Sequence, residues 1–106
     1  MVAAALLVGL GAPGAASAAA GDKSFVEDGW NLRECGISPG ECGVYGYTVG
    51  DQWDETWCWR DGGGIRWFKV TSWINANGTE KWKKGWISAG AVTRQATVPW
   101  CSNWDL

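Results

Sequence analysis

Apolar and aromatic residues alternate with polar ones in short runs along this 106-residue chain, which is the period of a β-strand. The alternation predicts strands over residues 29–35, 51–60, 65–75, 80–87 and 92–96. No run has the period of a helix, apart from a possible single 3₁₀ turn over residues 88–91. Three glycines follow Asp61, and Asn77-Gly78 is a strong hairpin signal because both residues tolerate positive φ. We therefore expect an all-β domain with a hairpin at each of these two turns.

The same alternation assigns side chains to the two faces of each strand. In residues 65–75 it places Phe68, Val70 and Ile74 on one side and Trp67 and Trp73 on the other. In residues 51–60 one face is crowded, because four large or charged side chains share it: Trp53, Glu55, Trp57 and Trp59. The sequence thus predicts a core face and an aromatic face.

The N-terminal residues have the pattern of a secretory signal peptide. Residues 1–20 carry no charged side chain, and an apolar run over 2–10 is followed by small residues that fit an A-x-A cleavage site. A membrane anchor is the alternative, but the run is far shorter than the roughly 20 residues that a spanning helix needs. We expect cleavage after Ala18 or Ala20, a flexible leader over residues 21–28, one folded domain over residues 29–106, and a secreted protein.

The charge balance and the residue types narrow the class of ligand. All nine basic and eleven acidic residues follow residue 20, and the net charge of −2 argues against a nucleic-acid binder. The chain has no histidine, which removes the commonest general base and the commonest metal ligand. We expect no metal, no cofactor, no nucleic-acid partner and, after signal cleavage, no membrane partner.

Four cysteines in a short secreted chain indicate two disulfides. Cys35 and Cys42 bracket a turn-rich loop that can bring them together, which leaves Cys58 to pair with Cys101 and to tie down the C-terminal tail. Zinc is the rival interpretation, but the chain offers neither a C-x-x-C pair nor a histidine.

Catalysis has little support in the sequence. A carboxylate pair for glycoside hydrolysis could come from four acids: Asp51, Asp54, Glu55 and Asp61. These acids lie beside predicted strand ends and turns, where solvated acids are common, and so short a chain has little room for a deep cleft. We expect no catalytic residue and no enzymatic activity.

The order of several short motifs resembles secreted bacterial Src-homology-3 domains. The matching segments are Asn31-Leu32-Arg33, residues 44–50, Trp67-Phe68-Lys69-Val70, Gly85-Trp86-Ile87-Ser88 and Val92. This resemblance implies a small five-stranded, partly open Src-homology-3-like barrel with a long loop after the first strand, here stapled by two disulfides. It further implies core positions at Phe68, Val70, Ile87 and Val92. The chain departs from the family in its longer third-to-fourth hairpin and in its ten tryptophans.

The resemblance also implies a ligand groove between the long loop and an exposed aromatic face. Carried across, the groove residues are Tyr45 and Tyr47 from the loop, together with Trp67 and Trp86. Trp73 and Trp82 are weaker candidates, since they flank the Asn77-Gly78 turn and could simply stack on each other.

The function that these residues suggest is binding. So small a domain cannot enclose ten indoles, and aromatic area at a surface marks binding sites. We expect a monomeric, secreted, non-catalytic module that binds cell-wall peptidoglycan or a related glycan or peptide. The alternative is a small secreted inhibitor of a protease or other hydrolase, acting on an extracellular protein partner.

Overall fold

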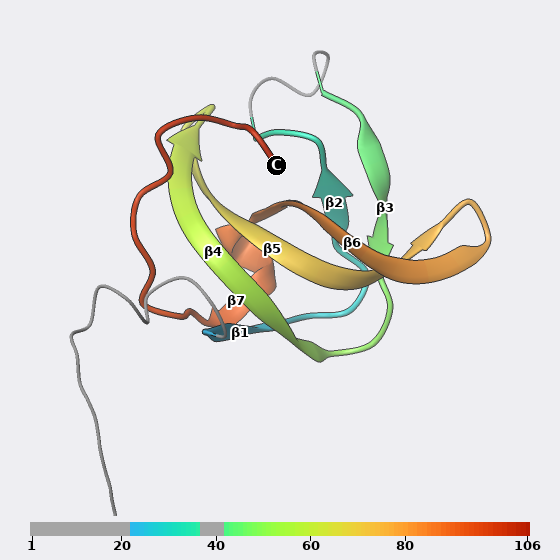
Figure 1. Cartoon of the computed structure of the whole chain (residues 1–106). Coiled ribbons are helices and arrows are strands. Elements are labelled where there is room, and N and C mark those ends of the chain that lie inside the picture. The colour runs from blue at the N-terminus through green and yellow to red at the C-terminus, as the bar shows by residue number, and fades with distance from the viewer. Residues whose placement is uncertain (1–21, 37–41) are drawn as a thin grey trace, which may run out of the picture.

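A computed structural model describes residues 22–36 and 42–106 of the chain, and these form one antiparallel sheet (Figure 1). The predicted signal peptide, residues 1–20, lies outside the described residues. The strands follow one another in the order β3-β2-β6-β5-β4-β1-β7, with a further pairing of β3 on β5. Their bounds are β1 Lys23–Val26, β2 Asn31–Arg33, β3 Val44–Thr48, β4 Gln52–Gly62, β5 Ile65–Ala76, β6 Thr79–Ser88 and β7 Val92–Arg94. A 3₁₀ turn, η1 Ala89–Ala91, joins β6 to β7 as the sequence suggested.

The all-β prediction is confirmed, but the five-stranded barrel is wrong, because the described residues form seven strands and no closed barrel. β1 lies within residues 21–28, which we expected to be a flexible leader, and β3 lies within the expected long loop. Neither segment shows clear alternation, and each gains its strand geometry from its neighbours: β1 pairs with both β4 and β7, and β3 with both β2 and β5.

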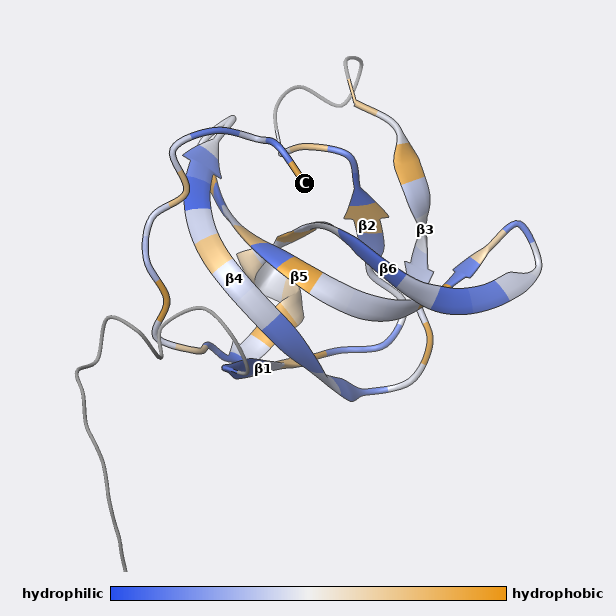
Figure 2. Cartoon of the chain, in the orientation of Figure 1, coloured by the Kyte–Doolittle hydropathy of each residue, from blue (hydrophilic) through white to orange (hydrophobic). Residues whose placement is uncertain are grey.

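The hydrophobic core lies on one face of the sheet, which we call the inner face. Figure 2 shows apolar and polar bands alternating along β5, as expected for a strand with one buried side. The predicted core positions Phe68, Val70, Ile87 and Val92 are all buried there. Burial of such side chains contributes roughly 1.5–3 kcal/mol each to folding.

Both predicted hairpins are present. β4 and β5 pair up to Gly62 and Ile65, and β5 and β6 pair up to Ala76 and Thr79. At the second turn Asn77 and Gly78 have φ of 54° and 89°, as a two-residue hairpin turn requires. This hairpin extends away from the rest of the sheet (Figure 1).

A register shift in β4 corrects the predicted aromatic face. Between Thr56 and Cys58 the pairing with β5 is irregular, so that Trp57 is an extra residue and Trp59 lies opposite Phe68. Trp59 therefore packs against the core on the inner face, whereas we had placed it with Trp53 and Trp57. A one-residue slip exchanges the two faces of a strand, and alternation alone cannot show it.

The structure has two disulfides, Cys35–Cys42 and Cys58–Cys101, in the pairing that the sequence suggested. The second ties the C-terminal tail, residues 98–106, to β4. Two backbone hydrogen bonds also join Trp59 to the tail. The Trp59 N–H donates to the Pro99 carbonyl oxygen (2.9 Å), and the Cys101 N–H donates to the Trp59 carbonyl oxygen (2.7 Å). Two disulfides favour an oxidising, extracellular environment. The described residues contain no helix with the length and hydropathy of a membrane span.

Candidate functional site

The face of β4, β5 and β6 that points away from the core, the outer face, is divided into two halves. In the first, which we call the covered half, the tail and the two disulfides lie over Trp67 and Trp86 and form a second hydrophobic cluster. Trp86 is completely buried and Trp67 is 8% exposed. The Trp86 ring meets Trp104 of the tail edge-on at 4.7 Å, and its Nε1–H donates to the Trp104 carbonyl oxygen at 3.0 Å.

This burial corrects the proposal that Trp67 and Trp86 form a ligand groove. Both rings do point to the outer face, as the alternation predicts, but neither presents a free ring face to a ligand. The backbone at Gly36 approaches the Trp67 ring so closely that a Cβ there would overlap it. The covering segments are distant in the sequence, and nothing in the local pattern of β5 or β6 indicates them.

The predicted loop tyrosines lie elsewhere. Tyr45 is half-buried against the core, and the Lys83 ammonium lies 4.5 Å from the centre of its ring. Burial raises the pKa of Tyr45, and the negative charge of Glu34 raises it further. Tyr47 is exposed on β3, opposite Asn31 of β2. The structure therefore does not bring Tyr45, Tyr47, Trp67 and Trp86 into one site.

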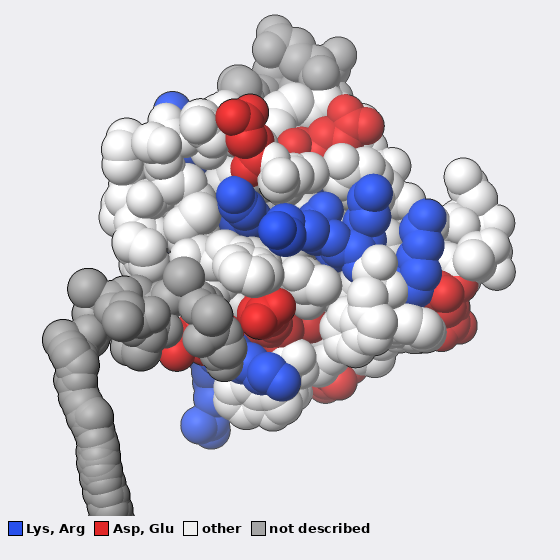
Figure 3. Space-filling view, viewed as in Figure 1, with Lys and Arg blue, Asp and Glu red and all other residues white. Residues whose placement is uncertain are grey.

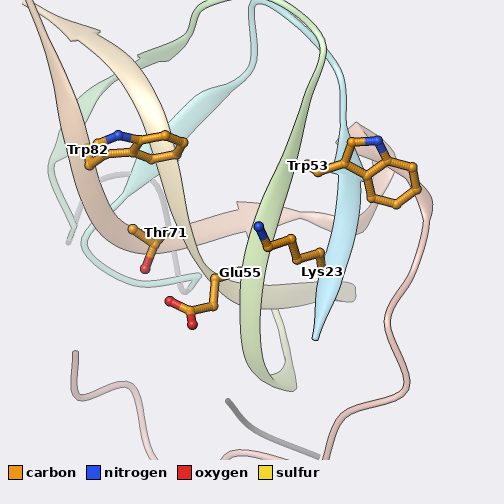
Figure 4. Close-up of a pocket in the computed structure, with 5 residues that line it drawn as sticks. All are labelled: Lys23, Trp53, Glu55, Thr71 and Trp82. Carbon is orange, nitrogen blue, oxygen red and sulfur yellow. The ribbon is translucent and has the colours of Figure 1, made fainter. Parts of the chain in front are cut away.

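The other half of the outer face, the open half, contains a hollow of about 300 Å³. It is lined by Lys23, Trp53, Glu55, Thr71 and Trp82 (Figure 4). The strand register explains how these residues meet: Lys23 lies opposite Glu55, and Glu55 opposite Thr71, in one row across β1, β4 and β5. The two indoles lie on the same side of this row, Trp82 near its Thr71 end and Trp53 near its Lys23 end, as Figure 4 shows.

Both tryptophans of the hollow are exposed, and each ring packs against a neighbouring aromatic ring. Trp53 is 51% exposed and Trp82 57% exposed. The Trp53 ring rests edge-on against Phe25 at 5.1 Å, and the Trp82 ring against Trp73 at 5.5 Å. The Trp73 Nε1–H donates to Glu80 Oε1 at 2.8 Å, which fixes that support. The cross-strand contact of Trp73 with Trp82 is the one the sequence suggested, and it leaves Trp82 in place beside the hollow.

The floor of the hollow is polar. The Trp57 Nε1–H donates to Thr71 Oγ1 at 3.2 Å, so the Thr71 hydroxyl can still donate its own proton to a ligand. Lys23 and Glu55 add one ammonium and one carboxylate. A polar floor with an aromatic wall near each end suits a ligand that has hydroxyl or amide groups on an otherwise apolar ring.

The acids that we considered for glycoside hydrolysis are not gathered there. Glu55 lines the hollow, but Asp54 beside it in sequence is buried on the inner side. Asp61 pairs instead with Arg66, at 3.2 Å from Nε to Oδ1, and Asp51 accepts the Asp28 backbone N–H. Within residues 22–36 and 42–106, no three His, Cys, Asp or Glu side chains lie close enough together to hold a metal ion.

Sequence reasoning missed three residues of the hollow as site residues: Lys23, Trp53 and Thr71. Lys23 was assigned to a flexible leader, and nothing in its neighbourhood indicates that β1 pairs with β4. Trp53 carried a usable signal, since it alternates with Glu55 on a predicted strand, but it was not singled out among the ten tryptophans.

Comparison of the chain with protein-family models, curated proteins and solved structures finds no match.

Proposed function

We propose that this protein is a secreted, non-catalytic binding module that holds bacterial cell-wall peptidoglycan in the hollow of the open half. One observation carries the proposal: Trp53 and Trp82 are half-exposed, and each is held by a neighbouring ring near one end of a polar floor. A partner that covers large exposed rings removes apolar surface from water, which is favourable, and planar rings stack on the apolar faces of sugars. Because the rings are already held, a ligand loses little free energy in ordering them.

We choose cell-wall peptidoglycan as the proposed ligand because of features of the sequence. The motif order that resembles secreted bacterial Src-homology-3 domains directs the proposal to the wall, although the strand count departs from that family. The signal-peptide pattern of residues 1–20 and the two disulfides support an extracellular location.

A pull-down on purified cell walls tests the proposal. We expect the protein to sediment with the walls, and Trp53→Ala and Trp82→Ala each to weaken retention by about tenfold, since removal of a stacking ring costs roughly 1–2 kcal/mol. Trp100→Ala is the matched control, because Trp100 is also 57% exposed but lies on the tail beside Arg60. Wild-type protein that stays in the supernatant, or retention that both hollow variants preserve, contradicts the proposal.

The alternative is an inhibitor of a secreted hydrolase. Titration against such enzymes separates the two functions, because an inhibitor acts at stoichiometric amounts and needs no wall. Stoichiometric inhibition without wall binding would replace the present proposal.

A further inference from the structure

Two lysines extend the polar floor of the hollow toward the covered half. Lys84 on β6 lies directly opposite Thr71, and Lys69 lies two residues before Thr71 on β5. Residues opposite each other on neighbouring strands are about 5 Å apart, and alternate residues of one strand about 7 Å. Both side chains point to the outer face, so their ammonium groups are within reach of a ligand seated in the hollow.

The two lysines are held next to each other. The Lys84 ammonium lies 4.5 Å above the ring centre of Trp57, which also donates to Thr71. Burial lowers the pKa of Lys69, the Lys84 charge lowers it further, and Asp105 of the tail acts in the opposite direction. Two neighbouring cations repel each other, and an anion bound between them removes that repulsion.

The basic side chains on this side of the molecule lie close together, with acidic side chains above and below them in Figure 3. Figure 3 shows a band of Lys and Arg side chains crossing the face of the sheet over β5 and β6. In the hollow itself Lys23 balances Glu55. The space between the tryptophans is thus nearly neutral, while its border toward Lys69 and Lys84 has two cations and one nearby anion, Asp105, and keeps a net positive charge.

We propose that the hollow, Lys69 and Lys84 form a single site for a saccharide that carries a carboxylate, with the sugar ring between Trp53 and Trp82 and the carboxylate on the two lysines. This inference rests on the proposed function and narrows its ligand: the lactyl carboxyl group of N-acetylmuramic acid is an uncharged amide where a stem peptide is attached, so the site selects glycan from which that peptide has been removed.

Other ligand classes fit less well. A quaternary ammonium group would stack on the tryptophans and pair with Glu55, but Lys23, Lys69 and Lys84 would repel it. An uncharged sugar would occupy the hollow and leave the repulsion between Lys69 and Lys84 in place. An acidic sugar satisfies both parts of the surface.

The test compares one disaccharide in two charge states. The probe is N-acetylglucosaminyl-N-acetylmuramic acid with its carboxylate free, or converted to the uncharged methylamide, and affinity is measured by calorimetry at low and high salt. We expect the acid to bind roughly two- to fivefold more tightly than the amide at low salt, since partly exposed ion pairs contribute up to about 1 kcal/mol. High salt should reduce this ratio.

Variants assign the effect to the lysines. Lys84→Gln and Lys69→Gln should bring the acid down to the affinity of the amide, whereas Lys84→Arg should keep the preference. Lys81→Gln is the control, because Lys81 lies on the same strand but opposite Ile74 on the inner face.

The outcomes separate this inference from the function on which it rests. Equal binding of acid and amide, with Trp53 and Trp82 still required, overturns the carboxylate site and leaves the binding module standing. Binding of neither form, together with no retention on walls, overturns both. A preference for the acid that Lys84→Gln and Lys69→Gln leave unchanged also contradicts the inference, because the carboxylate then lies elsewhere.

Discussion

The covered and open halves of the outer face share strands β5 and β6, and yet their tryptophans differ in exposure. Trp67 and Trp86 in the covered half, and Trp73 and Trp82 in the open half, all lie on β5 and β6 and point the same way. The first pair is buried under the tail, while Trp82 is 57% exposed. Strand position thus determines the direction of a side chain, and the segment that crosses the face determines whether that side chain is buried or exposed.

Hydrogen bonding follows the same division. In the covered half the indole N–H groups of Trp67 and Trp86 donate to the backbone carbonyls of Gly62 and Trp104, at 2.9 Å and 3.0 Å. Buried donors must find such partners, and backbone partners hold the rings in one position. In the open half Trp73 donates to the side chain of Glu80, which is exposed. The open half therefore keeps its rings near water.

The largest effect on stability should come from the covered half. Trp86→Ala removes a completely buried ring from between the tail and the sheet. We expect a loss of about 3–5 kcal/mol in the free energy of unfolding, measured by denaturant titration without reductant. A loss below about 1 kcal/mol would mean that the tail does not pack on this ring as described.

Removal of the tail disulfide should have the next largest effect. The Cys58→Ser, Cys101→Ser double variant opens a bridge of sequence separation 43 and should cost about 4 kcal/mol by chain entropy. The matched Cys35→Ser, Cys42→Ser variant opens a bridge of separation 7 and should cost only about 2.5 kcal/mol. Iodide quenching of tryptophan fluorescence should rise more in the first variant. Equal costs and equal quenching would show that the tail is held without its disulfide.

Asp54, on the inner side of the sheet beneath the open half, should make the free energy of unfolding depend on pH. The Asp54 side chain is completely buried there, with the Ser72 hydroxyl donating to its Oδ2. In the described part of the chain its Oδ1 has no hydrogen-bond partner. Burial raises the pKa of Asp54 from 3.8 to about 7, although the Ser72 hydrogen bond opposes the shift.

The sign follows from proton binding. The folded state holds the Asp54 proton more tightly than the unfolded state, so stability is greatest at low pH, falls between about pH 4 and pH 7, and then levels off. The expected fall is about 2–4 kcal/mol. Urea unfolding across this range measures it, and Asp54→Asn should flatten the profile. If stability instead rose with pH, and Asp54→Asn removed that rise, the carboxyl group of Asp54 would not be buried as described.

The smallest effect on stability should come from the hollow. Trp82→Ala removes an exposed ring and its edge contact with Trp73, for an expected loss of less than about 1.5 kcal/mol. Thermal unfolding of this variant beside Trp86→Ala compares the two halves on one strand. A loss as large as that of Trp86→Ala would place Trp82 among the structural residues.

The sequence predicts the parts of this molecule that depend on local pattern. The two hairpins, the core face of β5 and the pairing of the cysteines follow from turn chemistry, alternation and spacing. Contacts between distant segments do not. β1 becomes a strand through its pairing with β4, the shift before Cys58 turns Trp59 inward, and the tail covers Trp67 and Trp86. Each changes which tryptophans are exposed, which is why we propose the hollow at Trp53 and Trp82 in place of the groove expected at Trp67 and Trp86.

The most direct test of the division between the halves follows the ten indole N–H signals by two-dimensional ¹⁵N NMR during titration with soluble cell-wall fragments. We predict that Trp53 and Trp82 shift most, and that Trp67 and Trp86 stay in place because the tail covers them. Shifts that are confined to Trp67 and Trp86, or that are absent from Trp53 and Trp82 in the presence of bound fragment, would contradict the account.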